Sequence, residues 1–318
     1  MSEIAARPVR VLPLVVALFG VLLLAQTLHN LFGLGGDGLD NFFDDGLHTF
    51  LLGASAAACL ARAAVATRGR MTWTMFGLSL LAFLIGDVTW TLLDEGSTSA
   101  VSATVSDIFW LAYYPFAVAG LVFLIRDRIE GFDLHRWIDG LAAALIATTL
   151  GLIFFVDPVV NDYENGSTFS RTVEFAYPVC DVLLLGAVAG TFAVTAWRPG
   201  RTWLLLGLGL LSFTIADSIA AVQTVEGTYE AGRYDFLWTG GALAIALAAW
   251  LPYPARQRPV LLAGWKAVAL PIACQVLAAS IQVLALFRHL PESERILTVL
   301  VLGIATLQLW ISRPRRPE

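Results

Sequence analysis

Long runs of apolar residues, separated by short polar segments, make up most of the chain. A helix that spans a membrane needs about 20 mostly apolar residues, so each run predicts one spanning helix. The pattern predicts ten such helices, at residues 11–32, 47–66, 72–94, 105–125, 137–157, 176–197, 202–223, 234–252, 260–287 and 295–312. The first run follows basic residues as a signal peptide does, but it is longer than a usual signal sequence, and we expect a retained helix.

The composition agrees with a membrane protein. Of the 318 residues, 58% are apolar and 14% are charged, whereas soluble domains have roughly 25% charged residues. This excludes a soluble globular domain and an intrinsically disordered chain. The expected fold class is therefore all-α, a polytopic membrane protein with little length left for a soluble catalytic domain.

The basic residues indicate the orientation of the chain. Cytoplasmic loops of membrane proteins are enriched in Arg and Lys. One alternate set of loops contains sixteen basic residues, whereas the other contains four: Arg171, Arg233, Arg288 and Arg295. This asymmetry predicts that both termini are cytoplasmic and that the number of spans is even. A missed helix would exchange the later loops and remove the asymmetry.

An internal repeat is visible at an offset of 130 residues. Thr72-Trp73 and the pattern up to Asp87 recur as Thr202-Trp203 and the pattern up to Asp217. We expect a parallel repeat of two four-helix units, because an even number of spans preserves the orientation of each copy. The predicted parts are the first helix with an acidic outer loop (1–46), repeat unit one (47–157), repeat unit two (176–287) and a tenth helix (295–312).

Carboxylates within the predicted spans are the most informative polar residues, because a charge inside a bilayer is costly. Asp87 and Asp217 occupy equivalent repeat positions inside two spans, whereas Asp107, Asp181 and Asp235 begin helices that enter from outside. The structural interpretation is helix capping for the latter three and hydrogen bonding between helices for the pair. The functional interpretation places all five in one outer vestibule that binds a cation, a proton or a cationic ligand.

Aromatic residues accompany these carboxylates along the sequence. The candidates for a ligand-binding lining are Trp90, Trp110, Tyr114, Tyr177 and Trp238. The alternative interpretation is a belt of Trp and Tyr at the level of the lipid headgroups, or ordinary helix packing. Neither a catalytic motif nor a metal-binding or dinucleotide-binding spacing occurs, so we expect no enzyme, no cofactor and no nucleic-acid partner.

Several short motifs along the spans combine Asp with aromatic residues. They are Gly86-Asp87-x-x-Trp90, Ser106-Asp107-Ile108-Phe109-Trp110-Leu111-x-Tyr113-Tyr114-Pro115, Arg136-Trp137-Ile138-Asp139-Gly140, Ala176-Tyr177-Pro178-x-x-Asp181-x-Leu183-Leu184-Leu185 and Ala216-Asp217. Over residues 50–252 these motifs resemble the multi-span N-terminal region of bacterial diguanylate cyclases and cyclic-di-GMP phosphodiesterases. In that family the membrane region is taken to sense a signal, and cytoplasmic GGDEF or EAL domains respond to it.

The resemblance implies a sensory role without the family's catalysis, because the chain contains neither a GGDEF nor an EAL motif. We expect a non-enzymatic sensor or interaction module of the bacterial plasma membrane, with a cation or small ligand on its outer side. A cytoplasmic or membrane signalling partner is implied. The alternative is a solute or proton-coupled transporter built on the same repeat. Such a carrier would need a polar path to the cytoplasmic side, where the spans carry almost no ionisable residues.

Overall fold

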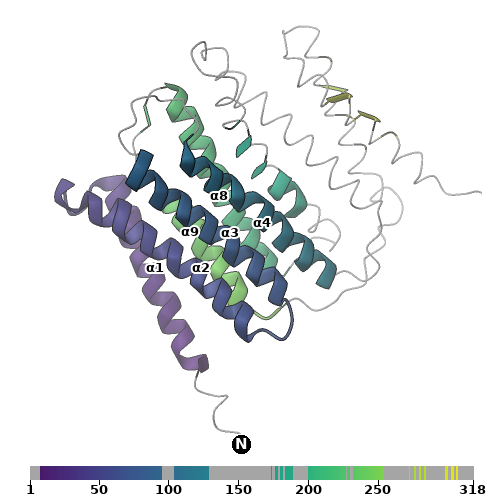
Figure 1. Ribbon diagram of the computed structural model, residues 1–318, viewed down its shortest axis with the longest axis horizontal. Coiled ribbons are helices and arrows are strands. Elements are labelled where there is room, and N and C mark those ends of the chain that lie inside the picture. The colour runs from purple at the N-terminus through teal and green to yellow at the C-terminus, as the bar shows by residue number, and fades with distance from the viewer. Residues whose placement is uncertain are drawn as a thin grey trace, which may run out of the picture. The chain divides into compact units, whose positions relative to one another are not determined.

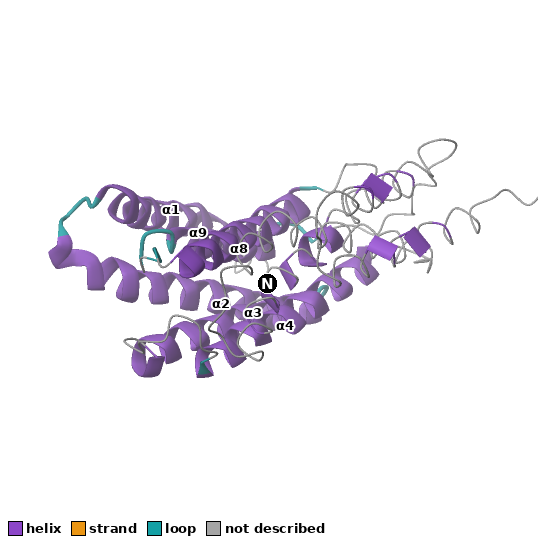
Figure 2. Cartoon of the chain, turned by 90° about the horizontal axis from the view of Figure 1, so that it is seen from above, coloured by secondary structure: helices purple, strands orange, loops and turns teal. Residues whose placement is uncertain are grey.

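The computed structural model describes part of the chain in detail. The described residues are 8–94, 104–128, 173, 176–177, 180–181, 183–188, 200–226, 228–229 and 232–253, together with 272, 276, 279–280, 283, 298–299, 302–303 and 306. The long helices among them are α1 (Pro8–Phe32), α2 (His48–Val65), α3 (Arg70–Thr89), α4 (Val105–Arg128), α8 (Arg201–Glu226) and α9 (Phe236–Trp250), shown in Figure 1. The described residues form helices, turns and loops without a strand, which confirms the all-α prediction for this part of the chain (Figure 2).

The described helices include five stretches that are long and apolar enough to cross a membrane. They are Pro13–Phe32, Asp37–Val65, Arg70–Leu93, Val105–Asp127 and Arg201–Ala221, and α9 is a shorter apolar helix. These helices lie where the hydrophobic pattern placed six of the predicted spans. The span predicted at 137–157 and most residues of the spans predicted at 176–197, 260–287 and 295–312 lie outside the described residues. The count of ten therefore stays a prediction.

Short helical turns extend two of these helices at their predicted outer ends. The acidic segment before α2 forms a 3-10 turn, η1 (Asp37–Leu39), followed by a π-helical turn, η2 (Asn41–Leu47). A second π-helical turn, η3 (Trp90–Asp94), continues α3. The side chain of His29 in α1 holds the first of these segments, because its ring contacts the Leu34 carbonyl oxygen at 3.0 Å and the Asp40 carboxylate at 3.2 Å.

The chain divides into two compact units. Unit 1 contains Met1–Ala100, Thr104–Gly120 and Leu204–Tyr253, and unit 2 contains Val101–Ala103, Leu121–Trp203 and Pro254–Glu318. Unit 1 therefore combines helices from both predicted repeat copies. It also contains the residues of the candidate site described below, except Tyr177 and Asp181, which belong to unit 2.

The core of unit 1 is formed by α2, which packs against α3 and α9. Gly77 in α3 permits a close approach to α2, because a Cβ atom at this position would lie 2.6 Å from a methyl carbon of Leu60. Phe83 in α3 and Phe213 in α8 meet edge to face, with ring centroids 5.0 Å apart. These two phenylalanines occupy equivalent positions of the predicted repeat.

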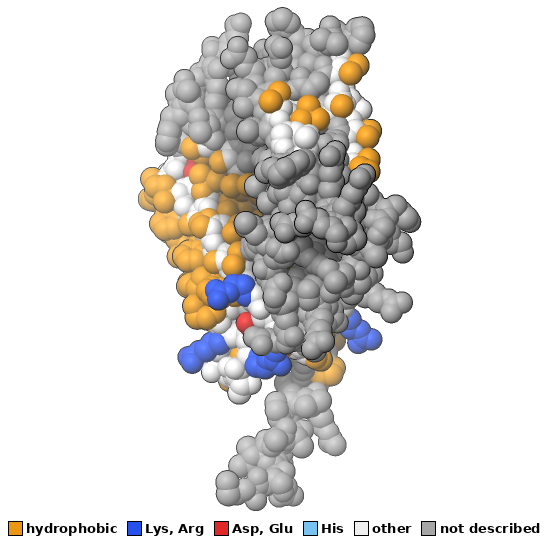
Figure 3. All heavy atoms as spheres, turned by 90° about the vertical axis from the view of Figure 1, so that its right-hand side faces the viewer, with side chains coloured by type: hydrophobic (Ala, Val, Ile, Leu, Met, Phe, Trp, Pro, Cys, Tyr) orange, Lys and Arg blue, Asp and Glu red, His pale blue; other side chains and the backbone are white. Residues whose placement is uncertain are grey.

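Apolar side chains also cover much of the outside of the described helices. Leu14 in α1 is 71% exposed, and Leu18, Val21 and Leu24 of the same helix are exposed as well. In Figure 3 apolar side chains form a broad band on one face of the molecule, with basic side chains near one end of that face. An exposed apolar surface of this kind suits contact with lipid.

Candidate functional site

Asp87, near the end of α3, forms hydrogen bonds to side chains of two other helices. Its Oδ1 atom accepts a hydrogen bond from Trp110 Nε1 at 2.8 Å, and its Oδ2 atom lies 3.1 Å from His48 Nε2. The preceding residue, Gly86, makes room for this arrangement, because a Cβ atom there would overlap the Trp110 indole. A carboxylate from α3 is thereby held between α2 and α4.

Asp217 in α8 has the same relation to a tryptophan. Its Oδ1 atom accepts a hydrogen bond from Trp238 Nε1 at 2.7 Å, and its Oδ2 atom accepts one from the Tyr114 hydroxyl at 3.1 Å. Asp87 with Trp110 and Asp217 with Trp238 therefore form matching pairs. In each pair the Asp and the Trp come from consecutive helices of one predicted repeat copy.

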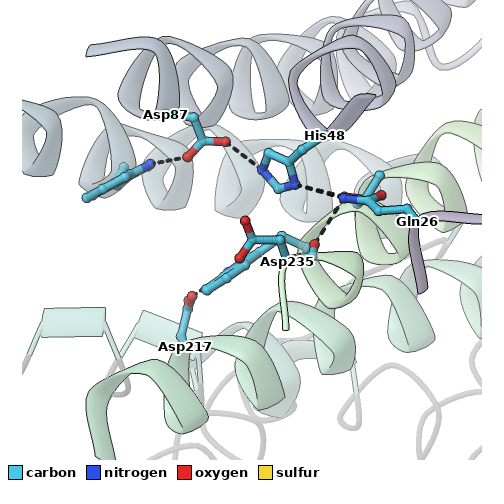
Figure 4. Close-up of polar contacts among 8 residues, drawn as sticks. Gln26, His48, Asp87, Asp217 and Asp235 are labelled. Atoms are coloured by element: carbon cyan, nitrogen blue, oxygen red, sulfur yellow. Dashed lines mark hydrogen bonds and ion pairs between the residues drawn. The ribbon is translucent and has the colours of Figure 1, made fainter. Parts of the chain in front are cut away.

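His48, the first residue of α2, connects four helices. Its imidazole is buried, with Nε2 against Asp87 in α3 and Nδ1 at 3.0 Å from Thr239 Oγ1 in α9. The amide nitrogen of Gln26 in α1 lies 3.5 Å from the same Nδ1 atom. Figure 4 shows His48 between Asp87 and Gln26, with Asp235 on the adjacent side.

Asp235 and Tyr229 belong to the segment before α9 and lie near these groups. Asp235 directly precedes the helix, and its backbone N–H donates to the Gly232 carbonyl oxygen at 3.2 Å. Its carboxylate interacts electrostatically with His48 and with the negative charges of Asp87 and Asp44. The Asp235 carboxylate therefore lies within electrostatic range of both Asp87 and His48.

The Tyr229 hydroxyl interacts electrostatically with three of the predicted carboxylates. Its pKa is raised, first by burial and then by the negative charges of Asp235, Asp87 and Asp217. Because 44% of the Tyr229 surface is exposed, water screens this effect. The shared neighbour nevertheless places the three carboxylates in one region of unit 1.

Asp44 connects the outer turn η2 with α1 and with the segment before α9. Its Oδ1 atom accepts a hydrogen bond from Asn30 Nδ2 of α1 at 2.6 Å. Gly232, which has a positive φ of 91°, packs directly on the Asp44 carboxylate, and a Cβ atom at this position would overlap it. Asp44, a residue of the acidic outer loop that the sequence analysis did not include among the site residues, therefore lies beside the site.

The structure assigns different places to the remaining predicted site residues. Asp107 interacts with the start of its own helix, because its Oδ2 atom accepts hydrogen bonds from the backbone N–H of Thr104 at 2.7 Å and from the Thr104 hydroxyl at 3.2 Å. This contact is the capping that the structural interpretation predicted. Trp90 packs near Trp110, with ring centroids 5.9 Å apart. Asp181 is buried and Tyr177 is half-buried, and both belong to unit 2, so their membership of the site stays a prediction.

The sequence analysis did not identify three polar residues of this centre, namely Gln26, His48 and Thr239. All three are buried. A signal was present, because each is a polar residue at or near the end of an apolar run, where an unpaired polar group is costly. His48 does not stand out in the sequence, because its partners are its neighbours in the fold rather than in the sequence.

The described residues contain no group of three His, Cys, Asp or Glu side chains with the geometry of a metal site. The centre instead combines carboxylates, one imidazole, two indole N–H donors and a tyrosine hydroxyl. Indole and hydroxyl donors satisfy the hydrogen-bonding capacity of a carboxylate without cancelling its charge. The arrangement can therefore take up a proton or attract a cation.

No model of a protein family, no curated protein and no solved structure matches the chain at a significant level.

Proposed function

We propose that the chain is a non-enzymatic sensor or interaction module of the bacterial plasma membrane. Its recognition centre consists of Asp87, Asp217 and Asp235 with His48, on the outer side of the membrane. The observation that carries this proposal is the pair of matching Trp–Asp hydrogen bonds, at 2.8 Å and 2.7 Å, in one compact unit. The proposal includes both cytoplasmic termini and a signalling partner in the membrane or cytoplasm.

The parallel four-helix repeat is part of this proposal. The two Trp–Asp pairs come from equivalent segments of the predicted copies, and Phe83 meets its equivalent Phe213. Contact between equivalent residues is expected beside a pseudo-two-fold axis that runs along the membrane normal. These contacts support a repeat whose two copies each contribute one carboxylate to the centre.

The energetic cost of the carboxylates supports a functional role. An ionised Asp inside a membrane protein costs several kcal/mol unless it is paired or hydrogen-bonded. Trp110 and Trp238 supply neutral donors, and only His48 can supply a positive charge to the centre among the contacts described above. Apolar residues would pack equally well at the positions of these carboxylates. We therefore infer that the negative charge is retained to interact with a cation or a proton.

A ligand-dependent change in stability tests this proposal. The full chain in lipid nanodiscs is heated in the presence of increasing Mg²⁺, Ca²⁺ or tetramethylammonium, and at decreasing pH. A species that binds the folded state raises the melting temperature. We expect at least one of these species to stabilise the wild-type protein and to have a reduced effect on the double variant Asp87→Asn/Asp217→Asn.

The matched control is Asp37→Asn/Asp45→Asn, which removes two exposed carboxylates of the outer segment and should respond as the wild type does. An equal response in the Asp87→Asn/Asp217→Asn variant would exclude these residues as the recognition centre. Flux of a solute or of protons through proteoliposomes would instead favour the transporter.

A further inference from the structure

The environment of His48 Nδ1 differs from that of Nε2. Nε2 faces the Asp87 carboxylate at 3.1 Å, and a carboxylate accepts hydrogen bonds, so Nε2 carries a hydrogen atom. Nδ1 faces the amide nitrogen of Gln26 at 3.5 Å and the Thr239 hydroxyl at 3.0 Å. Because an amide –NH₂ group is only a donor, the 3.5 Å Gln26 contact is a hydrogen bond only when Nδ1 is an acceptor. The Gln26 contact is thus that of a neutral histidine, whereas the Thr239 hydroxyl, which donates to the Asp235 carbonyl oxygen at 3.0 Å, fits either protonation state.

Protonation of Nδ1 would reverse this hydrogen bonding. The Thr239 hydroxyl could adapt, because its oxygen would accept from Nδ1–H while its hydrogen atom is donated to the Asp235 carbonyl oxygen at 3.0 Å. The Gln26 –NH₂ group could not adapt without moving, because two donors would then face each other. The amide would have to rotate and present Oε1, an atom that is buried without a hydrogen-bond partner in the described part of the chain.

Burial of the His48 imidazole opposes its protonation, whereas the negatively charged groups around it favour protonation. Asp87 faces it from α3, Asp235 from the turn before α9 and Asp44 from η2. From α1 and α9 the groups in direct contact are the uncharged side chains of Gln26 and Thr239. A positive imidazole would therefore have negative charge on several sides.

The Gln26 contact matters for α1 because this helix packs on the rest of unit 1 with few buried residues. Most of its apolar side chains are exposed, and a Cβ atom at Gly240 of α9 would lie at van der Waals distance from Leu23. Within the described part of the chain, its polar side-chain connections to other segments include the contact of Gln26 with His48, the hydrogen bond of Asn30 with Asp44 and the contact of His29 with Asp40. A change at Gln26 therefore alters one of few directional contacts of α1.

We propose that the proton is a signal that this centre reads, taken up from water at His48 Nδ1, and that the resulting rotation of the Gln26 amide changes how α1 is held. This inference rests on the proposed sensory function and names the species that the centre recognises. The bond formed is Nδ1–H, and the imidazole gains one positive charge. The structural output is a displacement of α1 relative to α2 and α9.

The distance between α1 and α2 tests this inference. Spin labels at positions 14 and 65, where Leu14 is 71% and Val65 is 66% exposed, report this distance by pulsed electron paramagnetic resonance. The full chain is used in nanodiscs, with Cys59, Cys180 and Cys274 replaced by alanine. Between pH 8.5 and pH 5 we expect a transition between two distance populations with the slope of a single proton.

Two substitutions separate His48 from other titrating groups. His48→Gln keeps a donor toward Asp87 and an acceptor toward Gln26, and it should abolish the transition. Gln26→Glu places a carboxylate against Nδ1–H, and it should move the midpoint upward by about one pH unit, a tenfold change in proton affinity. His29→Gln is the matched control, because this histidine contacts Leu34 and Asp40 rather than the centre, and it should keep the wild-type midpoint.

A pH-independent wild-type distance, or an unchanged midpoint in His48→Gln, would overturn the inference. If His48→Gln does not fold, Gln26→Glu decides the question, since a wild-type midpoint in that variant is equally incompatible with it. These failures are distinct from failure of the proposed function. The response of the melting temperature to Mg²⁺, Ca²⁺ or tetramethylammonium would persist in the first case and would be missing in the second.

Discussion

At the scale of single residues, two indole N–H groups hold the central carboxylates. Trp110 and Trp238 each donate to the Oδ1 atom of an Asp, at 2.8 Å and 2.7 Å. A hydrogen bond to a charged group contributes about 1.5–3 kcal/mol, and removing its donor leaves a partly buried charge with fewer partners. These two positions therefore need a side chain that donates an N–H hydrogen bond as well as one of the size of tryptophan.

The variants Trp110→Phe and Trp238→Phe test this role. We expect each to lower the free energy of unfolding by about 1.5–3 kcal/mol, because the indole donor is lost while an aromatic ring remains. The measurement is denaturant unfolding in detergent micelles. Trp90→Phe is the control, because Trp90 contacts Trp110 through its ring. A loss in Trp90→Phe equal to that in Trp110→Phe would show that ring size alone accounts for the effect.

The sequence identified these residues only in part. Asp87, Asp217 and the aromatic residues were recognised because polar groups in apolar runs are costly. Their pairing could not be read from the chain, since Asp87 and Trp110 are on different helices and Asp217 accepts from Tyr114 of the other predicted copy. His48 was overlooked because its partners come from α1, α3 and α9.

At the scale of elements, the hydrophobic pattern located the described helices closely. The prediction of 72–94 corresponds to α3 continued by η3, and the prediction of 202–223 corresponds to α8 at Arg201–Glu226. What the pattern could not show is the approach of one helix to another. That approach depends on small residues at particular points, such as Gly86 against the Trp110 indole.

Gly86→Ala tests this close contact between α3 and α4. The added Cβ atom would overlap the indole ring, so we expect a loss of about 1–3 kcal/mol in stability and a weakened bond from Trp110 to Asp87. Tryptophan fluorescence and thermal unfolding measure the two effects. Gly20→Ala is the matched control, because its Cβ atom would meet nothing within 4 Å and alanine favours a helix. Equal melting temperatures for the two variants would contradict the expectation.

At the scale of the whole molecule, the distribution of basic residues carries the proposed topology. Sixteen of the twenty Lys and Arg residues fall in loops assigned to the cytoplasm. Five described stretches are able to cross a membrane, and the complete topology is a prediction for the rest of the chain.

A reporter experiment tests the orientation of the termini. A fluorescent protein that folds only in the cytoplasm, fused after Glu318, should be bright in bacterial cells. An alkaline phosphatase that is active only outside the cytoplasm should be inactive at the same position and active when inserted near Tyr229. The reverse pattern for the fusions at Glu318 would place the C-terminus outside the cytoplasm and contradict the proposed topology.

The sequence by itself determined that the described chain forms long apolar helices, because hydrophobicity is a local property that each segment expresses alone. It also pointed to Asp87 and Asp217 as costly residues. Only the tertiary structure decided that both accept hydrogen bonds from tryptophans and that Asp107 interacts with the start of its own helix. It also decided that His48 joins four helices. Hydrogen bonds depend on the distance and angle between groups far apart in the chain, and hydropathy contains neither.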